Sequence, residues 1–152
     1  MITDFFSDMH STLRWVALAL LVVVVVKSVQ GARGNTPFTE GQRKLGLFTM
    51  IALHLQLVIG LVLYIKHPLG MNLLGEDSTM SDSYSRFFAM EHPTMMIVAI
   101  VLGTLGYSLS KRAADDAAKY KKQALFFGLC LLLIVLGIPW PFRPGFESIG
   151  WF

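Results

Sequence analysis

The sequence has a single cysteine, Cys130, in 152 residues. A disulfide within one chain and a metal site built from several thiolates are therefore excluded. Charged residues are also scarce: they make up 15% of the chain, against about 25% in an average soluble domain. Basic residues are missing ahead of the first apolar run, where a secretory signal peptide would carry them, and Asp4 and Asp8 stand there instead. We therefore expect the first apolar run to be a retained membrane helix.

In place of charge the sequence has apolar residues, which form 54% of the chain and give a mean hydropathy of +0.57. They gather in four runs, most of them close to the roughly 20 residues that span a bilayer as a helix. No stretch remains for a soluble domain. The sequence therefore predicts an all-α protein, a membrane four-helix up-down-up-down bundle formed by one transmembrane domain of residues 1–152. Its helices are expected at about 12–29, 45–65, 87–109 and 124–138.

Basic residues are distributed unevenly between the two sides of this predicted bundle. Nine of the thirteen lysines and arginines flank the first and third connections between the apolar runs. Because cytoplasmic loops are enriched in Lys and Arg, we expect both termini outside, in the bacterial cytoplasmic (inner) membrane. These loops account for the sequence pI near 9.2, so the charge requires no nucleic-acid partner. The nine residues are Lys27, Arg33, Arg43, Lys44, Lys111, Arg112, Lys119, Lys121 and Lys122.

All four histidines, His10, His54, His67 and His92, lie in or beside the apolar runs. Ionisable side chains within a membrane are rare and tend to mark functional sites. His67 comes just before Pro68 at a helix end, which is an ordinary interfacial position for this residue. His10, His54 and His92 are therefore the candidates for a site inside the bundle.

The sequence that follows His10 is partly repeated after His92. His10-Ser-Thr-Leu-Arg-Trp-Val-Ala aligns with His92-Pro-Thr-Met-Met-Ile-Val-Ala, with identity at His, Thr, Val and Ala. One interpretation is a duplicated helical hairpin whose copies are related by an axis along the membrane normal. This symmetry brings the two histidines to the same depth on the first and third helices. If those helices are diagonal neighbours, both rings point into the bundle, as the two axial ligands of a haem iron do.

His54 is expected at a different depth. At a rise of about 1.5 Å per residue, His10 and His92 lie about 25 to 28 Å from the basic loops, and His54 only about 15 Å. A polar ring near mid-membrane needs a hydrogen-bond partner, because an unsatisfied group there is costly. Three partners are open: haem iron, which would make His54 an alternative axial ligand, a polar group on another helix such as Thr104, or a quinone carbonyl.

Arg14 follows His10 by one helical turn on the same face. Its guanidinium is suited to pairing with the carboxylate of a haem propionate, and Glu91 or Asp8 is the alternative partner within the chain.

The methionines around His92 are further candidate ligands, because imidazole and thioether both suit copper. These methionines are Met90, Met95 and Met96.

Four short patterns resemble a family of small bacterial four-helix membrane proteins that carries the label cytochrome b. The resemblance runs along nearly the whole chain and implies haem b and electron transfer, without naming a donor or an acceptor. The haem would be bound non-covalently, because the chain lacks a Cys-x-x-Cys-His motif. The patterns are His10-x-x-x-Arg14-Trp15, His54-x-Gln56-x-x-x-Gly60, Glu91-His92-Pro93-x-Met95-Met96 and Pro139-Trp140-Pro141-Phe142-Arg143.

The leading hypothesis is a b-type cytochrome that binds haem through two of His10, His92 and His54 and relays electrons. Quinol is a candidate donor, and a respiratory membrane protein is a candidate partner. No acid–base pair or nucleophile is visible, so an electron-transfer protein is favoured over a stand-alone enzyme. Two haem-free alternatives stay open: an accessory subunit of a larger membrane complex, and an outer-face protein that handles copper or another metal.

Overall fold

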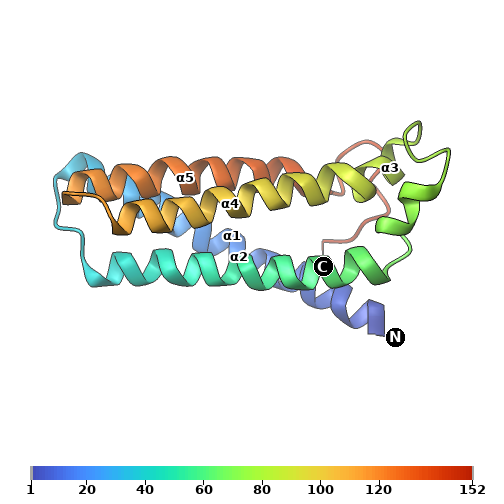
Figure 1. Cartoon of the computed structure of the whole chain (residues 1–152), viewed down its shortest axis with the longest axis horizontal. Coiled ribbons are helices and arrows are strands. Elements are labelled where there is room, and N and C mark those ends of the chain that lie inside the picture. Colours follow the sequence, from blue (N-terminus) through green and yellow to red (C-terminus); the bar gives the residue numbers. More distant parts are fainter. Residues whose placement is uncertain (1, 152) are drawn as a thin grey trace.

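Four long helices pack against one another in the computed structural model, which describes residues 2–151. Met1 and Phe152, which the predicted domain includes, lie outside the described residues. Consecutive long helices run in opposite directions (Figure 1), and no strand occurs in the part of the chain described. The predicted all-α four-helix bundle is therefore confirmed. The long helices are α1 (Ile2–Gly34), α2 (Glu40–Lys66), α4 (His92–Lys111) and α5 (Asp116–Gly137).

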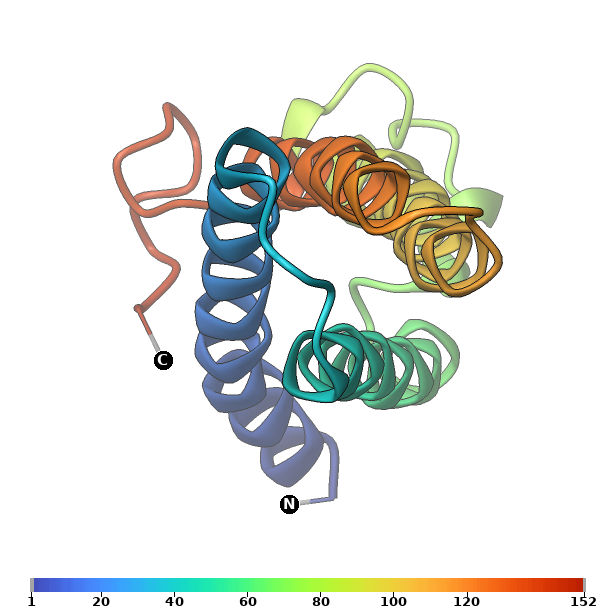
Figure 2. The same cartoon turned by 90° about the vertical axis from the view of Figure 1, so that its left-hand side faces the viewer.

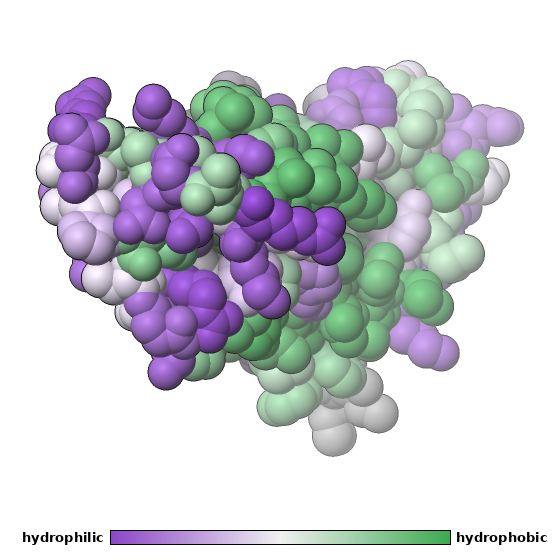
Figure 3. Space-filling model, turned by 60° about the vertical axis from the view of Figure 1, so that its left-hand side comes forward, coloured by the Kyte–Doolittle hydropathy of each residue, from purple (hydrophilic) through white to green (hydrophobic). Residues whose placement is uncertain are grey.

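The bundle has the surface of a multi-pass membrane protein. All four long helices are long and apolar enough to cross a bilayer. Large hydrophobic side chains point outward; Val58 and Leu132, for example, are 59% and 54% exposed. Figure 3 shows a hydrophobic band over the helices, next to an end covered by hydrophilic residues. Contact with lipid chains is favourable for such an apolar surface, whereas contact with water is not.

The helices extend beyond the predicted apolar runs. α1 begins at Ile2 rather than near residue 12, and its 33 residues span about 50 Å, more than the roughly 30 Å of a hydrocarbon core. α5 begins at Asp116 rather than near residue 124. Its start is fixed by the preceding Asp115, whose carboxylate accepts a 2.7 Å hydrogen bond from the backbone N–H of Ala118.

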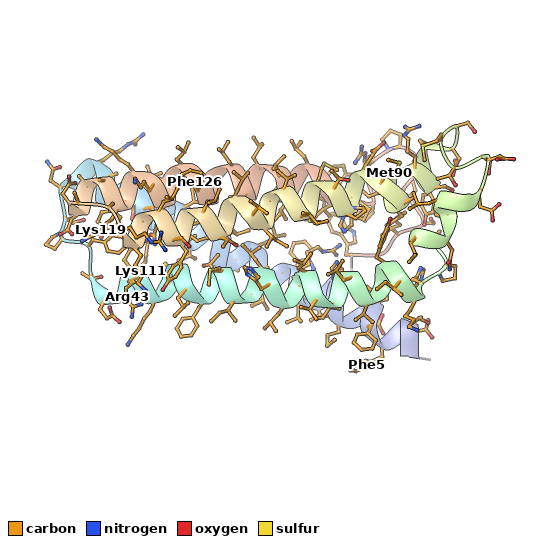
Figure 4. The ribbon with its side chains drawn as sticks, viewed as in Figure 1. Phe5, Arg43, Met90, Lys111, Lys119 and Phe126 are labelled. Atoms are coloured by element: carbon orange, nitrogen blue, oxygen red, sulfur yellow. The ribbon has the colours of Figure 1, made fainter. Side chains whose placement is uncertain are left out.

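The two ends of the bundle differ in what they carry. Figure 1 places both termini at one end, which we call the terminal end, together with the long connection between α2 and α4. That connection contains η1 (Met71–Gly75), α3 (Ser83–Arg86) and the π-helical turn η2 (Phe87–Glu91). The opposite end carries the two short connections, and we call it the basic end. Figure 4 shows Arg43, Lys111 and Lys119 gathered there.

Around the bundle axis the helices follow the order α1, α2, α4, α5 (Figure 2). α1 and α4 are therefore diagonal neighbours, as the pairing of His10 with His92 requires. The packing of α4 on α5 is the most extensive and that of α2 on α4 the sparsest. The apolar core between the helices includes Leu21, Leu53, Ala99, Phe127 and the single cysteine, Cys130.

A buried polar cluster joins three helices near the basic end. The side-chain nitrogen of Gln42 donates to the hydroxyl of Ser28 at 3.0 Å and to the amide oxygen of Gln123 at 2.8 Å. Gly46 leaves room for the amide group of Gln123, because a Cβ on residue 46 would lie 2.6 Å from the Gln123 side-chain nitrogen. All three polar residues are almost fully buried. The cluster therefore fixes α1, α2 and α5 relative to one another.

α1 and α5 approach closely near this cluster. A Cβ on Gly31 would lie 2.4 Å from the ring of Tyr120, so only glycine fits opposite that ring. The Tyr120 ring is held in place from two sides. Its hydroxyl donates to the Pro37 carbonyl at 3.1 Å, and its ring makes a T-shaped contact with the ring of Phe38.

The segment after α5 folds back over α1 at the terminal end. α5 ends at Gly137, just before Pro139 and Pro141, because proline lacks the backbone N–H that a continuing helix needs. The returning chain gathers aromatic rings around Trp15. The ring of Trp140 lies 6.1 Å and that of Trp151 6.5 Å from Trp15, centroid to centroid.

Candidate functional site

A cavity of about 310 Å³ lies inside the terminal half of the bundle. Its volume is near the lower end of the range for ligand pockets, which is about 300 to 1,000 Å³. Most of its lining is aliphatic or aromatic and comes from α1, α2, α4 and the end of α5. Polar side chains interrupt this lining: Ser7, His10, Ser11, Arg14, Gln56, Tyr64, His67, Tyr84 and His92.

His10 and His92 lie next to each other in this cavity, although they come from diagonal helices. The centroids of the two imidazole rings are 6.3 Å apart, and the ring planes make an angle of 75°. The structure therefore brings together the two histidines that the partial repeat paired. Their role as metal ligands stays a prediction.

The π-helical turn η2 comes immediately before His92. π-turns are rare and are frequently found at functional sites. The carbonyl of Ala89 within this turn accepts a 2.9 Å hydrogen bond from the Tyr64 hydroxyl of α2. Tyr64 thereby connects the turn to α2 and supports the place where α4 and its first residue, His92, begin.

A hydrogen bond fixes the tautomer of His92. Its Nδ1 lies 2.7 Å from the carbonyl oxygen of Gly137, the last residue of α5. A carbonyl oxygen only accepts, so the neutral ring carries its proton on Nδ1 and donates it. Nε2 then keeps its lone pair, which makes it a metal ligand or a hydrogen-bond acceptor. The last carbonyls of a helix have no partner within it, and His92 supplies one for Gly137.

His10 packs against a glycine of α2. A Cβ on Gly60 would lie 3.2 Å from Cε1 of His10 and 3.7 Å from its Nδ1. The first of these distances is shorter than an ordinary van der Waals contact. Glycine at this position therefore makes room for the imidazole ring. Nδ1 of His10 is buried and has no hydrogen-bond partner among the described residues.

Gln56 lies one turn before Gly60 on the same face of α2. Both belong to one of the four sequence patterns, but Gln56 was not among the predicted site residues. Its side-chain nitrogen donates to the backbone carbonyl of His10 at 2.6 Å. Its amide oxygen is buried and without a partner among the described residues. The spacing of four residues between Gln56 and Gly60, which puts both on the side that faces His10, is the signal that could have indicated this contact.

Arg14 lines the same cavity and makes no ion pair with a carboxylate of residues 2–151. Glu91, one of the two partners expected for it, is bound to Arg86 at 2.8 Å instead. One terminal nitrogen of Arg14 donates to the carbonyl of Trp151 at 2.6 Å. Its Nε is buried and unpartnered within the part of the chain described. The guanidinium therefore has an unused donor beside the cavity.

His54 lies apart from the other two candidate histidines. It is exposed on the outside of the bundle and does not line the cavity. Its Nδ1 is 2.8 Å from the Met50 carbonyl, and its Nε2 is 3.5 Å from the Thr104 hydroxyl of α4. Of the three partners expected for His54, the structure shows the contact with Thr104.

His67 and the methionines divide between the cavity and the surface. His67 lines the cavity, and its Nδ1 accepts a 3.2 Å hydrogen bond from the N–H of Leu69. Met96 lines it too, whereas Met90 is 44% exposed. Within residues 2–151 no three His, Cys, Asp or Glu side chains are grouped as ligands for a metal ion.

The comparisons with known proteins add no relative to this picture. No family model matches the chain, and no curated protein or solved structure is significantly similar to it. The resemblance to small membrane cytochromes therefore rests on the sequence patterns alone, and the geometry of the cavity is the evidence for a function.

Proposed function

We propose that the chain is a b-type membrane cytochrome that holds one haem between His10 and His92 and relays single electrons. The observation that carries the proposal is the separation of the two rings. A metal bound about 2 Å from a nitrogen of each imidazole puts the ring centroids about 6 Å apart once the size of the rings is included. The observed centroid separation is 6.3 Å.

The surroundings of His92 support this role. Histidines that bind a metal through one nitrogen almost always donate the other N–H to a carbonyl or carboxylate, which orients the ring. The bond from His92 Nδ1 to the Gly137 carbonyl has this form. The number of histidines also fits a haem. The macrocycle supplies four ligands to the iron, so the protein needs to contribute only two.

The rest of the cavity suits a flat, apolar group that carries carboxylates. Aliphatic residues such as Leu57, Ile97 and Ile134 line it and would exclude water from the macrocycle. Arg14 has a buried, unpartnered N–H there and no carboxylate partner within residues 2–151. A propionate would supply the missing counter-charge.

The haem would supply the iron that changes oxidation state. The protein would supply the ligands, the apolar lining and the charged group around it. His10 and His92 would hold the iron. The apolar lining keeps the local dielectric low, which would strengthen an interaction of Arg14 with a haem propionate. Burial and hydrogen bonding to the axial ligands are the means by which a protein tunes the potential of such a group.

The proposal includes a location and an orientation. We place the basic end in the cytoplasm of a bacterial cell and the terminal end, with the histidine pair, toward the outside of the cytoplasmic membrane. The positive-inside rule supports this orientation, because the basic residues flank the two short connections. Quinol in the membrane would be the electron donor.

A single experiment tests the haem. Purified protein in detergent should show a sharp Soret band when oxidised, and narrow α and β bands should appear when dithionite is added. A colourless protein that also takes up no haem from solution would contradict the proposal.

Copper is the second candidate, because the Met96 thioether lines the same cavity as the two imidazoles. Metal analysis of the purified protein distinguishes the two. Stoichiometric copper without a Soret band would favour the copper-handling role, and neither metal nor haem would favour an accessory subunit.

A further inference from the structure

His54 has an unused hydrogen-bond acceptor on the lipid-facing side of the bundle. Its Nδ1 lies 2.8 Å from the Met50 carbonyl, which can only accept, so Nδ1 carries the proton of the neutral ring. Nε2 is then an acceptor. The residue is exposed and lies near the middle of α2, which runs from Glu40 to Lys66. An unsatisfied acceptor at that depth is costly, because lipid chains have no donor to offer.

The neighbouring Thr104 does not satisfy this acceptor. Its hydroxyl has one proton, and it donates that proton to the Ile100 carbonyl of its own helix at 2.8 Å. The distance from its oxygen to Nε2 of His54 is 3.5 Å, at the outer limit for a hydrogen bond. The Thr104 hydroxyl therefore has no proton left to offer, and Nε2 still needs an O–H or N–H donor.

We propose that His54 binds a membrane-soluble quinol, with Nε2 accepting a hydrogen bond from one phenolic hydroxyl. The quinol lies on the outer surface between α2 and α4, where the packing of the two helices is sparsest. Exposed aliphatic side chains beside His54 and Thr104 give its ring and tail an apolar surface. They are Ile51, Val58, Val101 and Leu105, which are 42%, 59%, 52% and 40% exposed.

The hydrogen bonds also select the redox form of the ligand. A quinone carbonyl can only accept, so it offers nothing to Nε2 while Nδ1 donates to Met50. The hydroxyl of the reduced form is the complementary group. The site therefore prefers the form that gives up electrons, and this goes beyond the haem proposal, since the binding itself requires no haem.

A second copy of the chain is a poor alternative occupant. Among the described residues of α4, the one exposed hydroxyl side chain is Thr94, ten residues or about 15 Å along the helix from Thr104. A second His54 could not donate either, because its proton is already used. A quinol supplies the donor at the required depth.

The experiment uses the full chain in lipid nanodiscs with 15N-labelled histidine, and tetramethylhydroquinone as the probe, kept reduced by dithionite. We expect the Nε2 resonance of His54 to shift on titration. Tetramethylbenzoquinone, and the dimethyl ether of the hydroquinone, should bind about tenfold more weakly, because each lacks the hydroxyl proton. Equal binding of the three compounds would overturn the proposal.

Variants separate the hydrogen bond from a general apolar contact. His54→Ala should lose about tenfold in affinity for the hydroquinone, measured by its effect on tryptophan fluorescence. Val23→Ala, on the exposed face of α1, should bind as the parent chain does. An unchanged affinity in His54→Ala with an unaltered helical circular dichroism spectrum would contradict the proposal. So would a His54 resonance that shifts on protein dilution and not with the hydroquinone, since a second copy would then cover the ring. A colourless protein that takes up no haem from solution and still binds the hydroquinone would refute the haem proposal alone.

Discussion

Gln56 of α2 donates a 2.6 Å hydrogen bond from its side-chain nitrogen to the backbone carbonyl of His10 on α1. The bond anchors the amide group beside His10 and leaves its oxygen buried in the same cavity as the unpartnered Nδ1 of that histidine. The two remaining groups are complementary, because a protonated Nδ1 donates and an amide oxygen accepts.

The first prediction follows from this pair. Gln56→Leu removes the hydrogen bond to the His10 backbone carbonyl and should weaken haem binding about 10-fold, the lower end of the loss usual when a group that positions a metal ligand is removed. Titrating haem into the cofactor-free protein measures the effect. Gln56→Glu also lacks the side-chain N–H that donates to the His10 carbonyl, so it should bind haem no more tightly than Gln56→Leu. Equal affinities for all three proteins would show that Gln56 does not position His10.

The second prediction concerns the ligands themselves. His10→Ala or His92→Ala should abolish the Soret band of a low-spin, doubly ligated haem, because each removes one of two axial bonds. His54→Ala should leave haem content near that of the parent chain, because His54 lies outside the cavity. The opposite pattern, with haem lost in His54→Ala and kept in His10→Ala, would make His54 and His92 the ligands.

The third prediction tests the close approach of α1 to α5. Gly31→Ala should destabilise the bundle by about 1 to 3 kcal/mol, because the new methyl group would overlap the anchored Tyr120 ring. Thermal unfolding in detergent measures this loss. The haem spectrum should stay unchanged, because Gly31 lies near the basic end. Gly128→Ala is a matched control, since a Cβ there meets nothing within 4 Å.

The fourth prediction concerns the polar cluster at the basic end. Gln123→Leu removes the oxygen that accepts from Gln42 and leaves that buried amide without one of its partners. We expect a loss of about 1 to 3 kcal/mol, the usual cost of an unsatisfied buried group. The double variant Gln42→Leu with Gln123→Leu should be less destabilised than the sum of the two single variants. Strict additivity would mean that the two amides do not act together.

The fifth prediction is the orientation. A cysteine placed near either terminus of the Cys130→Ala protein should react with a membrane-impermeant maleimide in intact cells. A cysteine between α4 and α5 should react only after the cells are opened, because the positive-inside rule predicts that this basic connection lies in the cytoplasm. The reverse pattern would turn the histidine pair toward the cytoplasm and contradict the proposed outer location.

The sequence predicted the four helices because hydrophobic runs long enough to span a membrane are a strong, local signal. Their ends were harder to predict. The first ten residues of α1 include Asp4 and Asp8, which an apolar run excludes but a helix emerging from the membrane accepts. The start of α5 had a local signal, the capping carboxylate of Asp115, which a search for apolar runs overlooks.

The candidate site was predictable where it depends on side chains and not where it depends on the backbone. The similar sequences after His10 and His92 indicated the pair, and the helix rise separated His54 from it. The carbonyls of Gly137 and Trp151, which bind His92 and Arg14, leave no trace in the sequence, because every residue has such a group. The π-turn before His92 is likewise a backbone feature without a sequence signature.

The diagonal position of α1 and α4 also determines when the site can exist during synthesis. A ribosome delivers His10 with the first membrane span, His92 with the third, and the Gly137 carbonyl that orients His92 at the end of the fourth. Trp151, which binds Arg14, emerges later still. The cavity is therefore complete only after the fourth helix and the segment that follows it have been made, and a ligand that needs the whole cavity can bind only after all four helices are present.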